Sequence, residues 1–146
     1  MPSKPPPPHF FKLLYAIGFG AIVGRLILLL TTRGRKTGLP RITALQYEEI
    51  DGAVVVGSSR GTKSDWFRNI VADPHVQVRI KSKDFRGLAE PSTDPSRIAD
   101  FLEYRLQQHP RMIGAILRSE GIPMPPSRKE LEAYAAKTAI VVIRPE

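Results

Sequence analysis

The strongest chemical signal in the chain lies in residues 31–41, which carry four basic side chains and no acid. The basic residues are Arg33, Arg35, Lys36 and Arg41, with Gly34 and Gly38 among them. Glycines let the backbone approach an anion closely, and arginine and lysine form charged hydrogen bonds to phosphate and carboxylate groups. The segment therefore suits a polyanionic ligand tail. Taken alone, a solvated basic hairpin explains it slightly better.

Other reactive chemistries find little support in the sequence. The chain has no cysteine, which excludes disulfides, thiolate zinc sites, iron–sulfur clusters and cysteine nucleophiles. The residue order of a Walker A phosphate loop does not occur. The 3 histidines lack the i, i+4 spacing of a metal site, so no metal ligand is predicted. Ser59 has no recognisable histidine–carboxylate pair, so a hydrolase is not indicated.

The composition is that of an ordinary globular protein with an unusual charge. The 146 residues suit one domain, with 42% hydrophobic and 25% charged residues. The net charge of +8 predicts an anionic partner, such as nucleic acid, an anionic membrane or a phosphorylated ligand. The lack of cysteine fits a reducing cytoplasm, which is the expected location.

The N-terminal residues divide into a proline-rich leader, residues 1–9, and an apolar stretch that follows it. Lys12 and Arg25 interrupt the stretch and leave an uncharged run of 12 residues, whereas a membrane span needs roughly 20. No small-residue cleavage site of a secretory signal follows. We expect a helix over residues 10–24 that packs on the protein or makes a peripheral membrane contact.

The elements that must position the basic segment can be predicted from periodicity and turn residues. Strands are predicted at residues 26–32, 41–47, 53–58, 75–81, 85–90 and 138–143. The first of these is apolar throughout and is expected to be buried on both faces. Helices are predicted at residues 64–72, from Asp94-Pro95, at 109–120 and from Ser127, which forms a capping box with Glu130. Six strands and several helices predict one small α+β barrel.

Several short motifs follow one another in a specific order between residues 24 and 90. They are residues 29–32 (Leu-Leu-Thr-Thr), 34–38 (Gly-Arg-Lys-Thr-Gly), 58–61 (Ser-Ser-Arg-Gly), Trp66 with Asn69, and Asp73-Pro74. The combination resembles the deazaflavin (F420)-dependent nitroreductase family, and the closing segment 138–145 is also similar. Each piece is weak alone, but their order is specific.

The resemblance implies a fold, a cofactor and a reaction. The fold would be a split β-barrel of the FMN-binding type, with about six mainly antiparallel strands, and residues 10–146 would form the deazaflavin-binding domain. The cofactor would be coenzyme F420, with FMN as an alternative. Its reduced form would transfer a hydride to a planar apolar acceptor, either a quinone, a nitroaromatic or an activated alkene. A separate F420-reducing enzyme would then regenerate it.

The resemblance also assigns roles to six residues of this chain. Basic positions of the family that hold the phosphate and oligoglutamate tail of the coenzyme match Arg35, Lys36, Arg41 and Arg60. Trp66 and Asn69 match residues that border the deazaflavin ring, although a lone tryptophan is more often a core anchor. No catalytic side chain is assigned. Solvent or a polar residue such as Ser59 would supply the proton.

Three departures from the family pattern leave the acceptor open. The segment between Ser59 and Trp66 is short, Phe67-Arg68 replaces a tyrosine and a histidine, and most tyrosines of the C-terminal substrate region are absent. A small basic barrel that binds nucleic acid is the alternative from another class. It is weaker because only Tyr47 and Phe85 are available for base stacking. An FMN-binding or non-catalytic split barrel is a third reading, and the oligomeric state is open.

Overall fold

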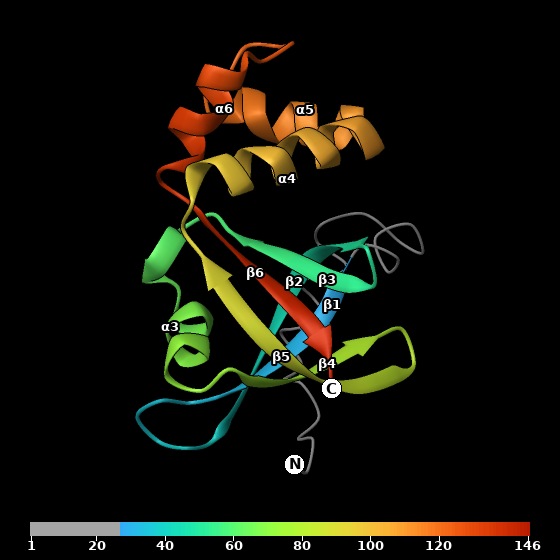
Figure 1. Ribbon diagram of the computed structural model, residues 1–146, viewed down its shortest axis with the longest axis vertical. Coiled ribbons are helices and arrows are strands. Elements are labelled where there is room, and N and C mark those ends of the chain that lie inside the picture. Colours follow the sequence, from blue (N-terminus) through green and yellow to red (C-terminus); the bar gives the residue numbers. More distant parts are fainter. Residues whose placement is uncertain (1–26) are drawn as a thin grey trace.

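The computed structural model describes residues 27–146, which form a six-stranded barrel with helices around it (Figure 1). The strands are β1 (Ile27–Arg33), β2 (Pro40–Ile50), β3 (Ala53–Ser58), β4 (His75–Ile80), β5 (Lys83–Ser92) and β6 (Ala139–Pro145). The helices are α3 (Asp65–Ala72), α4 (Pro95–Gln108), α5 (Pro110–Ser119) and α6 (Arg128–Ala135), with a 3₁₀ turn, η1, at Gly61–Lys63. The predicted leader and N-terminal helix lie outside the described residues.

The sheet closes on itself in the order β1-β2-β3-β6-β5-β4, and every neighbouring pair is antiparallel. The three-stranded meander β1-β2-β3 and the hairpin β4-β5 are joined by the pairing of β4 with β1. The last strand, β6, closes the barrel between β3 and β5. This confirms the predicted split β-barrel of six antiparallel strands with flanking helices.

Local sequence signals account for most of the element boundaries. The predicted Asp51-Gly52 turn has a positive φ at both residues, 51° and 78°, as the tight turn of a β-hairpin requires. The capping box of Ser127 with Glu130 is present at the start of α6. Strand β2 runs further than predicted, to Ile50, because its pairing with β3 extends it through two glutamates.

The interior of the barrel is a continuous apolar core. In β1, Leu28, Leu30 and Thr32 are fully buried, whereas the residues between them are only half-buried. The prediction that this strand is buried on both faces was therefore wrong. A barrel strand has one interior face, and the uniform apolar composition of β1 conceals this alternation.

Helix α3 closes one end of the barrel. Its residues Trp66, Phe67 and Ile70 pack into the same core as the strand interiors, and the two aromatic rings meet edge to face at 6.2 Å. Ser64 is the N-cap residue, as predicted, but its hydroxyl contacts Ser58 Oγ at 2.8 Å instead of capping the helix backbone. The β1–β2 loop lies beside α3 (Figure 1).

Helices α4, α5 and α6 form a layer on one side of the barrel (Figure 1). Ile98 and Phe101 of α4 pack on Val55 and Val142, which lie on the outer face of β3 and β6. Arg128 of α6 donates 2.8 Å hydrogen bonds to two carboxylates of α4, those of Asp100 and Glu103. Within residues 27–146, no helix combines the length and apolar character that crossing a membrane requires.

Candidate active site

The basic loop between β1 and β2 is a tight turn closed by its own backbone. The Gly34 N–H donates to the Leu39 carbonyl at 2.8 Å, and the Gly38 N–H donates to the Gly34 carbonyl at 2.7 Å. A Cβ atom at position 34 would lie 2.9 Å from Thr37 Oγ1 and 3.1 Å from the Leu39 carbonyl oxygen, so glycine is needed there. Gly38 has a φ of 74°, which also favours glycine.

A cleft of about 640 Å³ lies between this loop, the start of β2 and helix α3. It is lined by Gly34, Arg35, Lys36, Thr37, Pro40, Arg41, Ile42, Thr43, Asp65, Trp66 and Asn69. Five of the six residues predicted to hold the coenzyme are among them. The sixth, Arg60, is exposed at the start of η1 and is not part of the lining. The structure therefore gathers the predicted site at one place, with Arg60 outside it.

Arg35 is held firmly against α3. Its backbone N–H and its Nη1 both donate to Asn69 Oδ1, at 3.2 and 2.9 Å. Its Nη2 forms an ion pair with Asp65 Oδ1 at 3.2 Å, and 22% of the side chain is exposed. The guanidinium is thus fixed by two α3 residues, and its charge is already partly balanced.

Asn69 connects three elements, although sequence matching suggested a role beside the ring. Its Nδ2 donates to Thr32 Oγ1 of β1 at 3.2 Å, while its Oδ1 accepts the hydrogen bonds from Arg35. Only 3% of Asn69 is exposed. We infer that Asn69 mainly holds the basic loop against the end of the barrel that α3 closes.

This arrangement predicts a stability cost for Asn69→Ala. The substitution leaves buried partners of the amide without hydrogen bonds, so the free energy of unfolding should fall by about 1–3 kcal/mol. Urea unfolding followed through the fluorescence of the single tryptophan measures the change. Gln107→Ala, on an exposed position of α4, is the control. Equal stability of the two variants would contradict the bridging role.

The side chains of Lys36 and Arg41 are less constrained than that of Arg35. Both are exposed, and within residues 27–146 neither forms an ion pair. Among the described residues that line the cleft, Asp65 alone is acidic, and its carboxylate pairs with Arg35. The cleft therefore carries a net positive charge, with two cations available to an anionic ligand.

Trp66 is a core residue that also lines the basic cleft. It is 8% exposed and packs into the barrel core, as an anchor would. It also lines the basic cleft, so part of its indole is available to a planar ligand.

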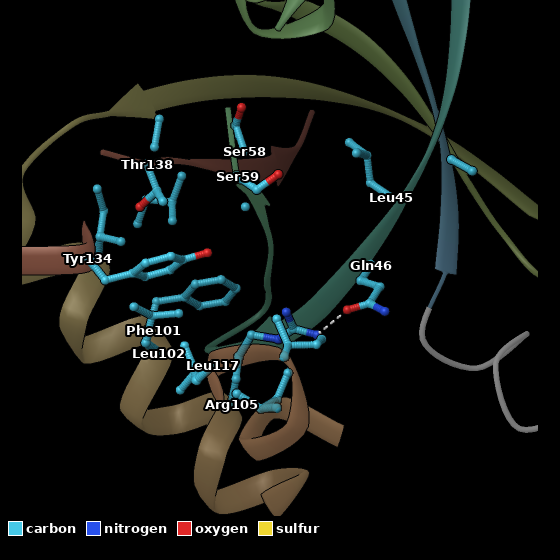
Figure 2. A pocket seen from close by; sticks show the side chains of 17 residues that line it. Leu45, Gln46, Ser58, Ser59, Phe101, Leu102, Arg105, Leu117, Tyr134 and Thr138 are labelled. Atoms are coloured by element: carbon cyan, nitrogen blue, oxygen red, sulfur yellow. Dashed lines mark hydrogen bonds between the residues drawn. The ribbon is translucent and has the colours of Figure 1, made fainter. Parts of the chain in front are cut away.

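A second cavity, of about 290 Å³, lies between the barrel and the helical layer (Figure 2). Its apolar lining is Ala44, Leu45, Gly57, Ile98, Phe101, Leu102, Ile113, Ile116, Leu117, Ala139 and Ile140. Its polar lining is Gln46, Ser58, Ser59, Arg105, Tyr134 and Thr138. Such a cavity, mostly apolar with a few polar groups, is typical of a site for a small organic molecule.

Consecutive residues of β2 line the basic cleft and then the apolar cavity. Residues Pro40 to Thr43 line the basic cleft, and Ala44, Leu45 and Gln46 line the apolar cavity. A ligand with an anionic tail in the first could therefore present its other end to the second.

A group of charged and polar side chains, not predicted from the sequence, borders the apolar cavity. Arg105 Nε donates to Glu48 Oε2 at 3.2 Å, and Arg105 Nη2 donates to Gln46 Oε1 at 2.8 Å. His109 Nε2 lies 3.2 Å from Glu48 Oε2. The available signal was spacing, because Arg105 falls seven residues after Ile98 and so shares the apolar face of α4.

Tyr134 contributes a phenol to the same cavity. Burial raises the pKa of Tyr134 above its ordinary value, and the negative charge of Glu120 raises it further. The hydroxyl is therefore protonated at neutral pH and can donate a hydrogen bond. Within the described part of the chain, no cluster of three or more potential metal ligands occurs.

The same architecture occurs in solved oxidoreductases of the split β-barrel class. An F420 reductase superposes with a TM-score of 0.52 and 25% identity, over 84% of this chain and 87% of that chain. An F420-H2 dependent reductase superposes with a TM-score of 0.53 and 21% identity, over 81% of this chain and 94% of that chain.

The chain belongs to the F420H(2)-dependent quinone reductase family, whose sequence model matches residues 16–112. An F420H(2)-dependent quinone reductase of Mycobacterium tuberculosis is 36% identical over 67 residues, which are 44% of this chain and 45% of that protein. The match thus spans less than half of the relative. Membership of this family confirms the resemblance found in the sequence.

Proposed function

We propose that this protein is an F420-dependent oxidoreductase that transfers a hydride from the reduced coenzyme to a small planar acceptor, a quinone first of all. The observation that carries the proposal is the succession of a basic cleft and an apolar cavity along β2. Family membership and the name of the tuberculosis relative support the same cofactor and reaction.

In this proposal the basic cleft holds the anionic tail of the coenzyme. A tail with one phosphate and several carboxylates needs a group of cations, and exposed Lys36 and Arg41 are available for direct contact. Arg35 supplies charge from a fixed position beside them. Arg60 lies outside the cleft lining, so it can meet only a part of the tail that extends beyond the cleft.

The deazaflavin ring would lie between Trp66 and the middle of β2, with the acceptor in the apolar cavity. When bound, reduced F420 supplies the hydride itself. The protein orients the two molecules, and the apolar side chains of the barrel and helical layer exclude water from between them. The hydroxyls of Ser59 and Tyr134, or solvent, would supply the proton that accompanies the hydride.

The structure gives less support to a nucleic-acid-binding role. Tyr47 is 7% exposed and belongs to the barrel core, and Phe85 packs against that core. Neither ring is therefore presented on the surface as a platform for base stacking. FMN binding is the remaining alternative, and it would leave the cations of the cleft with only one phosphate to hold.

Anaerobic mixing of chemically reduced F420, a naphthoquinone and the purified full chain tests the reaction. We expect the absorbance of the oxidised deazaflavin to return only when protein and quinone are both present, and one hydroquinone to form for each coenzyme oxidised. A reaction of equal rate with reduced FMN, or none with reduced F420, would contradict the proposal.

A further inference from the structure

We propose that Arg105 determines acceptor specificity by binding an oxygen atom of the acceptor inside the apolar cavity. This inference rests on the proposed function, since it concerns the molecule that receives the hydride. The inference adds one requirement to the proposed function: the acceptor must carry a carbonyl or nitro oxygen, and an apolar ring alone does not suffice.

The guanidinium of Arg105 is almost enclosed by protein. Its side chain is 13% exposed, it lines the apolar cavity, and its Cζ lies 5.8 Å from the centroid of the Phe101 ring. A cation is rarely placed against apolar side chains unless a partner offsets its charge. The charge of Arg105 therefore needs a partner close by.

Glu48 and Gln46 provide that partner and fix the orientation of the guanidinium. The Glu48 side chain is 7% exposed and accepts from Arg105 Nε, and the Gln46 amide oxygen accepts from Nη2. Two acceptors on one strand hold the planar fork in a single position. Pairing of the guanidinium with the carboxylate offsets the cost of placing a charged group beside the cavity.

The third nitrogen of the guanidinium, Nη1, has no partner in the described part of the chain. Within residues 27–146, Arg105 Nη1 has no hydrogen-bond acceptor, and no side-chain nitrogen or oxygen there is both fully buried and unpaired. Among the described residues, Nη1 of this cavity-lining side chain is therefore available to a ligand. Figure 2 shows Arg105, Ser59 and Tyr134 around the same space, so a ligand there would meet three hydrogen-bond donors.

This donor arrangement matches the chemistry of an oxygen-bearing acceptor. When a quinone accepts a hydride at one position, negative charge develops on its carbonyl oxygen before a proton arrives, and a nitro group behaves similarly. The hydride brings two electrons and one hydrogen, and one further proton completes the hydroquinone. A fixed cationic donor such as Arg105 stabilises the charge on this oxygen, while an acceptor without such an oxygen would leave the donor unpaired.

Binding of two matched probes to the coenzyme-free protein tests the inference directly. Menadione carries two carbonyls on a methylated double ring, and 2-methylnaphthalene has the same rings without them. By ligand-detected NMR we expect menadione to bind wild type about tenfold or more tightly than 2-methylnaphthalene, as expected for a charged hydrogen bond. Equal affinities of wild type for the two probes would overturn the proposal.

The variants are chosen so that loss of folding cannot imitate the result. Removing Arg105 alone would leave the buried Glu48 carboxylate without its guanidinium partner and with only His109 beside it, so the main variant is the double substitution Glu48→Gln with Arg105→Met. We expect it to bind 2-methylnaphthalene as wild type does and to lose most of the preference for menadione, since only the neutral donors Ser59 and Tyr134 remain. Arg118→Met, on an exposed position of α5, should keep the preference for menadione. A preference unchanged in the double variant would overturn the proposal.

Two further measurements locate the effect. Gly57→Leu should abolish binding of both probes, because a Cβ at position 57 lies in ordinary contact with Phe101 at 3.7 Å and the longer side chain fills the cavity. Retained binding in this variant would place the probes elsewhere and overturn the inference. F420 affinity, measured separately, should be equal in all variants of Arg105. Absence of F420 binding in wild type would instead count against the proposed function, and the two failures are thus distinguishable.

Discussion

Replacing Lys36 and Arg41 together with alanine is expected to weaken F420 binding by about a hundredfold or more, with the melting temperature within about 2 °C of wild type. Both side chains line the basic cleft, both are exposed, and neither pairs with an acid of residues 27–146. Each therefore contributes little to folding and can give a charged hydrogen bond to the tail. Quenching of tryptophan fluorescence measures the affinity, and a thermal scan measures the stability.

The matched control removes the same charge from the β4–β5 hairpin. Lys83 and Arg86 are exposed residues of β5 and do not line the cleft. The double substitution of these two with alanine should leave F420 affinity within about threefold of wild type, because charges beyond a screening length of about 8–10 Å contribute little at physiological salt. Equal losses in the two double variants would show that only the overall charge matters.

Arg35 should behave differently from its neighbours in such an experiment. Its contacts with Asn69 and Asp65 tie the loop to α3, so Arg35→Ala would reduce stability as well as affinity. From the sequence alone Arg35 and Lys36 cannot be distinguished, because both are basic and they are adjacent. The distinction arises from α3, which lies about thirty residues further along the chain and whose position the local sequence does not specify.

The parts of the fold that are predictable from the sequence are those with local causes. Asp51-Gly52 specifies its hairpin turn through backbone conformation, and Ser127 with Glu130 specifies the start of α6 through reciprocal capping. The basic cleft was also predictable, because a single loop carries most of its cations. The order of the motifs along the chain also connects that loop with Trp66 and Asn69.

The apolar cavity was not predictable in the same way. It forms where β2, β3 and β6 meet the helical layer, so its lining comes from segments up to about a hundred residues apart. Charged residues such as Glu48 and Arg105 are usually exposed, even where spacing places Arg105 on the apolar face of its helix. Only the packing of α4 on the barrel brings them to 3.2 Å and buries them together.

A second prediction with a large expected effect concerns the length of the coenzyme tail. If exposed cations of the cleft bind it, affinity should rise with each glutamate added and fall about tenfold or more between 50 and 500 mM salt, since screening shortens from about 14 to 4 Å over that range. FMN, which has one phosphate and no glutamate chain, should bind more weakly and with less dependence on salt. Turnover at saturating coenzyme should depend little on tail length, because tail contacts are equal in the ground and transition states.

The most direct test of the tail-binding role is therefore a titration of the full chain with F420 bearing short and long tails, and with FMN, at low and high salt. We expect affinity to decrease in the order long tail, short tail, FMN, with the differences largest at low salt. Equal affinity for all three ligands at both salt concentrations would contradict this role, because the site would then recognise only the ring.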